Sequence, residues 1–399
     1  MLSVLFLEDM ALVADAASSI GPALAGRLRG RTQDAAADFA GVTVFHGAEA
    51  IDQVADAWLA LENEGGAATP FQSLAMARAA TEVHLKAGEI PRIAVVRHCG
   101  RPVVILPTVI GTRFGVKVAR FLGDPLIQYG DALCEPGTAK RHIEAAFHAA
   151  ADRSAVDALH LRKVRADARI APLLRQHATA FNHDEAPFLD TARLGDEAAE
   201  EPRKLRHCRR KLSALGPLRL EVTQGDAARE HLRDALALKR RWVEARRLPS
   251  SVVGCDHWEA AIKRLADHDG DPRLNVAILH VGDRPAAYEV AFTAGGRWYA
   301  FLGAIVDDFA RHSPGRVQVA DTIAWCRDNG FDRYDLLAPS DEVKRSYCSE
   351  AAPVADYAHA LRPAGHVLAA ALRLTPAAKA MLVRLPAPLR KAAMSVAGR

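Results

Sequence analysis

A repeated order of predicted elements constrains the fold of this 399-residue chain more than any other feature. The first half shows two helical segments, at 48–63 and 71–88, followed by Val- and Ile-rich strands within 91–134. A helix at 137–151 and a strand at 155–164 complete this half. Period-3.6 and period-2 patterns distinguish the helices from the strands.

The second half repeats this order. Helices are predicted at 226–247 and 255–268, and three strands joined by Gly-Asp and Gly-Gly turns lie within 273–305. A helix at 311–325 and a strand at 331–337 follow. A tandem duplication of one unit explains this order more simply than two unrelated domains. We therefore predict an α/β (α+β) protein with two tandem units, each a mixed, mostly antiparallel sheet flanked by helices.

The length of the chain also favours two units, because a single hydrophobic core stops growing at about 250–300 residues. Together with the order of elements, composition divides the chain into five segments. We predict a mobile leader over 1–47, an N-terminal domain over 48–195, a basic helical junction over 196–224, a C-terminal domain over 225–361 and a basic helical tail over 362–399.

Charge and cysteine usage exclude several classes of protein. The net charge of +4 indicates no obligate polyanionic partner, and the six cysteines form no C-x-x-C pair or zinc-type cluster. No apolar run reaches the roughly 18–20 residues of a membrane span, and acidic residues near the N-terminus argue against a signal peptide. We expect a reduced, cytoplasmic protein without a metal, and the basic tail leaves a peripheral location at the inner membrane open.

The stretch HSPGRV, at 312–317, is an unusual helix start. Ser313 is a suitable N-cap and Pro314 suits the first helical position. Gly315 and Arg316 then stand where acidic residues would normally balance the helix dipole. A bare, positively charged helix start suits an anion such as a phosphate. The alternative is a tight strand-to-helix turn with no ligand.

The surroundings of this helix resemble the GNAT superfamily, and more closely the CelD/BcsL-type acetyltransferases of exopolysaccharide and cellulose synthesis. The tandem layout is also similar to the Fem aminoacyltransferases. The resemblance covers roughly 48–361. In the second half it rests on the strand 298–303, the acidic-aromatic loop 307–309, Ser-Pro-Gly at 313–315, Gly330, the strand 335–337, Lys344 and Tyr347, and in the first half on TPFQS, LPTVIG and RFLGD.

The resemblance implies direct acyl transfer from acyl-CoA, with acetyl-CoA as the donor, to an amine or a hydroxyl and without a metal. The absence of a G-x-S-x-G elbow and of a P-loop motif in the sequence agrees with direct transfer. By matching positions, the residues expected to hold the donor are Phe301, Gly303, Ser313, Gly315, Arg316 and Val317.

The expected catalytic groups are acidic, basic and phenolic side chains around this helix. Glu289, Asp307 and Asp308 are the candidate bases. Lys344 matches a lysine that the Fem group has near the reacting carbonyl, and Tyr299 is a candidate for positioning or protonating a group. Each candidate also has a non-catalytic alternative. Glu289 would face solvent in an alternating strand, and Asp307 and Asp308 would only solvate a turn. Lys344 would be an exposed helix lysine, and Tyr299 would pack in the core.

The partners follow from the same resemblance. We expect a small-molecule or saccharide acceptor and peripheral contact with a membrane-associated polysaccharide synthesis complex, with no nucleic acid. HSPGRV keeps only the central glycine of the usual GNAT pyrophosphate loop, which leaves two other functions open. One is a Fem-like transferase using aminoacyl-tRNA, in which the basic segment 203–211 would contact RNA. The other is a non-catalytic GNAT-like scaffold.

Overall fold

The computed structural model of the chain describes residues 41–193, 201–246, 250, 252–348 and 350–384. Most of the predicted leader, the first residues of the predicted junction and the end of the predicted tail therefore lie outside the described residues.

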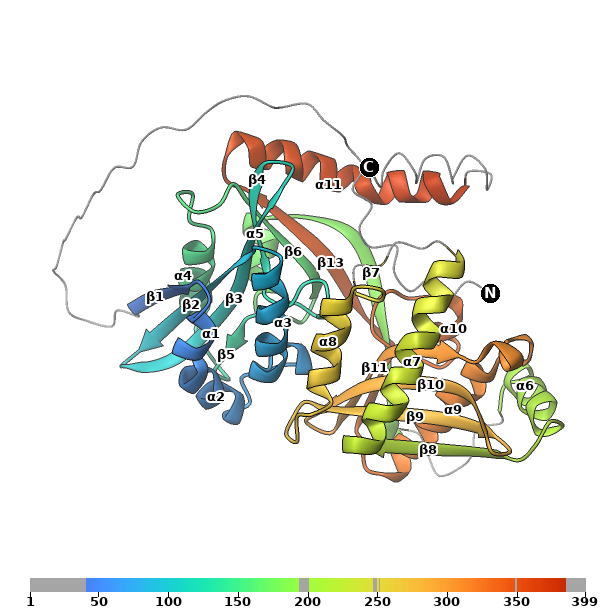
Figure 1. Ribbon diagram of the computed structural model, residues 1–399. Coiled ribbons are helices and arrows are strands. Elements are labelled where there is room, and N and C mark those ends of the chain that lie inside the picture. The colour runs from blue at the N-terminus through green and yellow to red at the C-terminus, as the bar shows by residue number, and fades with distance from the viewer. Residues whose placement is uncertain (1–40, 194–200, 247–249, 251, 349, 385–399) are drawn as a thin grey trace, which may run out of the picture.

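One continuous mixed sheet runs through both halves of the described chain (Figure 1). Its strand order is β1-β2-β3-β4-β6-β13-β7-β12-β11-β10-β9-β8, and the short β5 pairs beside β3. Most neighbours are antiparallel, whereas β4 with β6 and β11 with β12 are parallel. The strands are β1 (Gly41–His46), β2 (Ile90–His98), β3 (Arg101–Arg113), β4 (Val116–Phe121), β5 (Leu133–Cys134), β6 (Ala158–Arg165), β7 (Thr179–Asp190), β8 (Leu218–Gln224), β9 (Arg273–Val281), β10 (Arg284–Ala294), β11 (Arg297–Ile305), β12 (Arg333–Asp335) and β13 (Glu350–Ala360).

Helices flank this sheet in both halves, which confirms the predicted fold class. The first half contains α1 (Ala50–Gln53), α2 (Ala55–Asn63), α3 (Leu74–Lys86), α4 (Lys140–Ala150), α5 (Ala171–His177) and the 3-10 turns η1 (Pro70–Gln72) and η2 (Thr191–Arg193). The second half contains α6 (Arg203–Ser213), α7 (Gly225–Arg246), α8 (Asp256–Leu265), η3 (Asp307–His312), α9 (Pro314–Asp328), α10 (Glu342–Arg345) and α11 (Pro363–Arg384).

Two strands are exchanged between the halves at the centre of the sheet. β7, from the first half, pairs with β12 of the second half, and β13, from the second half, pairs with β6 of the first. β7 and β13 also pair with each other (Figure 1). The sequence analysis did not anticipate either strand. Proline and alanine in EAAPVADYAHA, and the polar start of TAFNHDEAPFLD, give weak strand signals.

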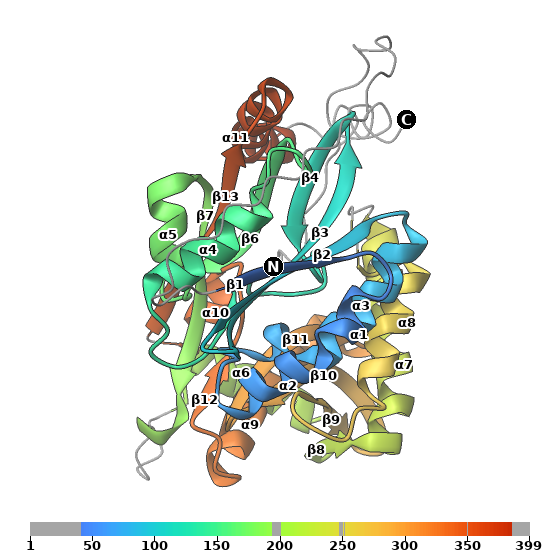
Figure 2. The same ribbon diagram turned by 90° about the vertical axis from the view of Figure 1, so that its left-hand side faces the viewer.

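The edges of the halves also differ from the sequence-based boundaries. β1 lies inside the stretch predicted as a leader, and β8 lies inside the predicted junction and pairs with β9. Within the described part of the junction, the helix is α6, whose apolar face packs against α9. In the tail, α11 packs on β13 and β4 through Leu368 and other apolar side chains (Figures 1 and 2).

An apolar core continues across the boundary between the halves. The ring of Phe71, in η1, makes edge contacts with Tyr129 of the first half and with Phe292 and Tyr299 of the second, at centroid distances of 5.7, 6.3 and 6.0 Å. The helices α3 and α8 lie side by side over the same boundary (Figure 1). The two units therefore share buried aromatic surface as well as strands.

A buried charged network fills the place where β4 and β6 part. These strands pair only at Val118 with Ala158 and Ala119 with Leu159. Beyond that point Asp124 bridges Arg120, from β4, at 3.0 Å and Arg162, from β6, at 3.1 Å. All three charged side chains are at most 7% exposed. Burial by itself would raise the pKa of Asp124, but the two guanidiniums outweigh it and hold the pKa well below its usual range.

We predict that Asp124→Asn destabilises the protein by about 3–5 kcal/mol, because it removes the carboxylate that two buried guanidiniums share. Arg120 then keeps its ion pair with Glu89, and Arg162 keeps a 4.0 Å contact with Asp356. Urea unfolding at neutral pH measures this loss. The control is Asp52→Asn, which removes an exposed ion pair with Arg78 at 3.6 Å and is expected to cost less than about 1 kcal/mol. Equal losses in the two variants would contradict a structural role for the network.

Candidate functional site

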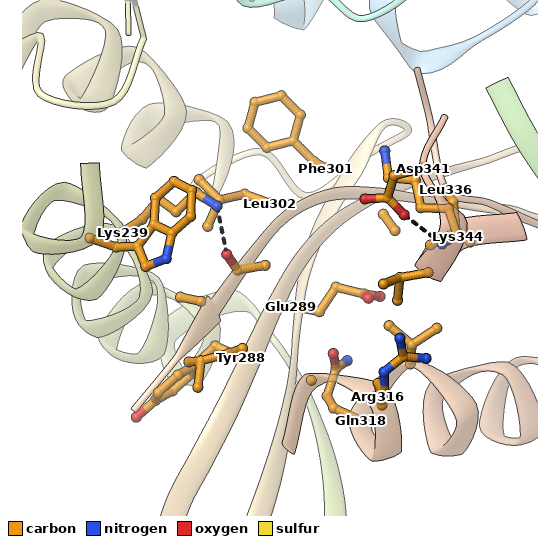
Figure 3. A pocket seen from close by; sticks show the side chains of 18 of the residues that line it. Lys239, Tyr288, Glu289, Phe301, Leu302, Arg316, Gln318, Leu336, Asp341 and Lys344 are labelled. Carbon is orange, nitrogen blue, oxygen red and sulfur yellow. Dashed lines mark hydrogen bonds between the residues drawn. The ribbon is translucent and has the colours of Figure 1, made fainter. Parts of the chain in front are cut away.

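A cavity of about 320 Å³ opens where the parallel strands β11 and β12 part. The strands pair only over residues 297–299 and 333–335, and the residues that follow them line the cavity. The remaining walls come from β10, α7, the start of α9 and α10 (Figure 3). The parting of two parallel strands therefore places backbone, charged groups and a helix start around one volume.

The start of α9 faces this cavity with little to cover it. Ser313 adopts a left-handed conformation, with φ of 57°, and its side chain makes no capping hydrogen bond, so the expected side-chain N-cap is wrong. At Gly315 an added Cβ would lie 3.3 Å from Cδ1 of Ile305. The glycine thus keeps the first turn of the helix bare on the cavity side.

Arg316 adds a buried positive charge to this helix start. Its side chain is 8% exposed, and its Nε has no hydrogen-bond partner within the described part of the chain. Tyr347 donates a hydrogen bond from its hydroxyl to the Arg316 carbonyl at 2.8 Å. A buried N–H without an acceptor costs free energy, and an anion bound at the helix start would remove that cost.

Glu289 lies at the centre of the cavity wall and is 3% exposed, so it is not a solvent-facing strand residue (Figure 3). One carboxylate oxygen accepts a hydrogen bond from Nε1 of Trp298 at 2.8 Å, and the other accepts one from the hydroxyl of Tyr334 at 2.6 Å. Burial raises the pKa of Glu289 despite these hydrogen bonds. The side chain of Gln318 also hydrogen-bonds to this carboxylate. Three donors leave about one of its four lone-pair positions, so the carboxylate is held in place and can still accept a proton.

Lys344, in α10, approaches the cavity from the side opposite α7 (Figure 3). Its Nζ donates hydrogen bonds to the carbonyls of Leu337 at 3.0 Å and Pro339 at 2.8 Å, which leaves one of three N–H bonds for a ligand. Burial lowers the pKa of Lys344 to about 8, although the carboxylate of Asp341 opposes that change.

The sequence analysis missed a second lysine, Lys239, which enters from α7 and is 5% exposed (Figure 3). Its Nζ donates to the carbonyl of Gly303 at 3.1 Å and lies 4.6 Å from the ring centroid of Trp242. Burial first, and then the positive charge of Lys344, lower the pKa of Lys239 to about 8. A sequence signal existed, because Lys239 stands on the buried stripe of α7 between Leu236 and Val243.

The structure brings together most of the predicted residues but not all of them. Phe301, Gly303, Ser313, Gly315, Arg316, Glu289, Asp307 and Lys344 line the cavity.

The other predicted residues lie elsewhere. Val317 is fully buried in a cluster with Phe309. Asp308 is exposed and forms an ion pair with Arg284, outside the cavity lining. Tyr299 lines a second cavity on the boundary between the halves, and Asp307 is exposed at the rim of the first.

Within the described ranges, no group of His, Cys, Asp and Glu side chains is arranged to hold a metal ion. The described helices also include none that is long and apolar enough to cross a bilayer.

Comparison with known proteins matches this half of the chain to a family. Residues 201–345 match the family described as an acetyltransferase (GNAT) domain. The second half carries a GNAT-type domain. The match includes α6 and β8, so the segment predicted as a junction is matched together with that domain.

The fold of a larger part of the chain is supported by a solved structure with a TM-score above 0.5. A structure described as the crystal structure of FemX aligns with a TM-score of 0.53 and 11% identity, covering 72% of this chain and 92% of that one. The C-terminal domain of a putative lysylphosphatidylglycerol synthetase from Agrobacterium fabrum aligns at 0.46 with 14% identity, covering 68% and 85%. L-PGS from Bacillus licheniformis aligns at 0.47 with 12% identity, covering 68% and 85%. Comparison with curated protein sequences finds no match.

We predict that Lys239 makes stability depend on pH above neutrality. In the folded chain the pKa of Lys239 is lowered to about 8, whereas in the unfolded chain it is about 10.4. Between these two pH values the unfolded chain holds one proton more than the folded chain, so the free energy of unfolding rises with pH in that window. In Lys239→Met the part of this rise due to Lys239, about 2–3 kcal/mol, should be absent, whereas the part due to Lys344, whose pKa is also lowered to about 8, remains. Urea unfolding from pH 7.5 to 10.5 measures it, with the exposed Lys211→Met as control. A Lys239→Met profile parallel to wild type would contradict the prediction.

Proposed function

We propose that the chain transfers an acyl group from acyl-CoA, with acetyl-CoA as the donor, directly to an amine or hydroxyl acceptor. One observation carries this proposal. The bare, cationic start of α9 opens into the same cavity as the unpaired part of β11, a base and a lysine.

The residues present fit the phosphates of such a donor. The N–H groups at the start of α9 have no side-chain cap, Gly315 leaves them accessible, and the buried Nε of Arg316 lacks an acceptor. A helix start with an added arginine is a suitable site for a pyrophosphate. Beyond Tyr299, the edge of β11 is released from β12, so its backbone groups can pair with the amides of an extended arm.

The cavity also holds groups suited to the transfer itself. A CoA thioester supplies an activated acyl group when bound. Glu289 is placed to take the proton from the acceptor as the new N–C or O–C bond forms and the C–S bond breaks, and that proton then passes to the departing sulfur. The remaining N–H of Lys344 can donate to the carbonyl oxygen as negative charge develops there.

The acceptor class and the biological setting extend the same proposal. We propose a small molecule or saccharide as acceptor, in exopolysaccharide or cellulose synthesis, as the resemblance to the CelD/BcsL type implies. The protein would act in the cytoplasm, in peripheral contact with a membrane-associated synthesis complex. An assay of CoA release against sugar amines, sugar hydroxyls and peptide amines identifies the acceptor class.

A second candidate function uses aminoacyl-tRNA as the donor. The observation in its favour is the outer face of α6, where five lysine and arginine side chains are exposed on a helix that packs against α9. Such a face beside the donor site suits a nucleic acid backbone. These side chains are Arg203, Lys204, Arg206, Arg210 and Lys211.

We predict that Gly315→Glu abolishes stabilisation by CoA compounds, because the carboxylate would occupy the helix start and repel phosphate. A thermal-shift panel with acetyl-CoA, longer acyl-CoAs, free CoA and charged tRNA measures the effect. Gly315→Ala is the matched control, since its Cβ meets only the flexible side chain of Ile305 and should reduce the shift slightly. Stabilisation by charged tRNA alone would favour the second candidate, and no response of wild type to any donor would favour a non-catalytic scaffold.

We predict that Lys344→Ala lowers kcat roughly 100-fold while leaving the Kd of the acyl-CoA within about twofold, because the lost N–H acts only as charge develops. Single-turnover CoA release and isothermal titration measure the two quantities. Arg345→Ala is the control, since that neighbouring side chain is exposed and directed to Ser340 and Glu185. Normal turnover by Lys344→Ala would remove this lysine from the mechanism.

A further inference from the structure

A second cavity, of about 310 Å³, lies on the boundary between the two units. The first unit contributes Gln72, Tyr129 and Arg165 to its lining, and the second contributes Tyr299 and Arg333. On three segments, consecutive residues line the two cavities in turn, so the cavities lie next to each other. These pairs are Gln128 and Tyr129, Tyr299 and Ala300, and Asp335 and Leu336.

The carboxylates around the second cavity already have partners. Asp131 accepts hydrogen bonds from three backbone N–H groups at 2.8–3.0 Å. Asp167 receives Nε and Nη2 of Arg165 at 2.8 and 2.9 Å. Asp335 accepts from Nη1 of the same arginine at 3.1 Å and from the hydroxyl of Tyr129 at 2.7 Å. The lining thus holds three carboxylates and three arginines, and of these arginines only Arg165 is ion-paired to a carboxylate within the described ranges.

Arg297 and Arg333 are register partners on the adjacent parallel strands β11 and β12. Both line the cavity, and neither forms an ion pair with a carboxylate in the described part of the chain. The guanidinium of Arg333 stacks on the ring of Phe188 at 4.2 Å, and Arg297 lies beside the hydroxyl of Tyr299. Like charges opposite each other on neighbouring strands repel, and an anion between them reverses that effect.

We propose that the second cavity binds an anionic group, a carboxylate or a phosphate, of the acceptor substrate through Arg297 and Arg333. An acceptor held there extends towards the adjoining cavity, where Glu289 and Lys344 lie. The assignment to the acceptor rests on the proposed acyltransferase function, whereas binding of the anion does not.

The chemistry of the two side chains suits an anion with more than one oxygen. Two guanidiniums present parallel N–H groups to carboxylate or phosphate oxygens, which a single ammonium does not. Arg297 is exposed and Arg333 is half-buried, so the pair lies between solvent and the interior of the cavity. The buried Arg165, fixed by two carboxylates, supports the inner wall without contributing net positive charge.

The test measures thermal stability against inorganic phosphate and, separately, against acetate, at constant ionic strength. Every protein carries Gly315→Glu, so that the start of α9 does not contribute. In that background we expect a saturable rise in Tm with at least one of the two anions. Arg297→Gln with Arg333→Gln should raise the Kd of that anion at least about tenfold. The anion with the lower Kd distinguishes phosphate from carboxylate.

Two comparisons keep the result interpretable. The single variant Arg297→Gln changes an exposed side chain, and it should weaken anion binding even if the double variant does not fold. Arg101→Gln with Arg219→Gln removes two exposed strand arginines outside both cavities and should leave anion binding unchanged.

The outcomes separate this proposal from the proposed function. An anion response that is absent, or that Arg297→Gln and the control variants affect equally, would overturn the second site. If the protein without Gly315→Glu shows no response to acyl-CoA while the arginine-dependent anion response is retained, the acyltransferase function is overturned and the anion site is left standing.

Discussion

The pairing of β7 with β13 is the contact on which the rest of the structure depends. Each strand belongs to one unit by sequence and completes the sheet of the other, so hydrogen bonds within this pair convert two half-sheets into one. The adjoining Arg165–Asp335 ion pair joins β6 to the end of β12 in the same region. Both cavities border Asp335 or the residues that follow it. The position of the candidate site is therefore set by both units together.

In each unit two parallel strands part and leave a gap, and the two gaps are filled differently. Where β4 parts from β6, Arg120, Asp124 and Arg162 close the gap with buried charge pairs. Where β11 parts from β12, apolar walls and a helix start leave it open. Fold alone does not determine function, and here the side chains at one gap create a site while those at the other create a structural network.

The sequence was informative where patterns are local and strong. The helix at 311–325 and the strand group within 273–305 followed from periodicity. Most of the site residues named from the resemblance to the GNAT superfamily line the first cavity. The exchanged strands could not be predicted, because their stability comes from neighbours far along the chain and not from their own propensity. The left-handed Ser313 depends on tertiary context, and Lys239 required attention to a charged residue on an apolar stripe.

The hydrogen bonds of Asp335 connect the first unit to the candidate active site through the backbone. Its carboxylate holds the hydroxyl of Tyr129 and also the amide of Leu337, which has a left-handed φ of 60° and whose carbonyl receives Lys344. A change at Tyr129, in the first unit, would reach the ammonium group of Lys344, in the second, through three successive hydrogen bonds, so the two units are mechanically coupled at the candidate site.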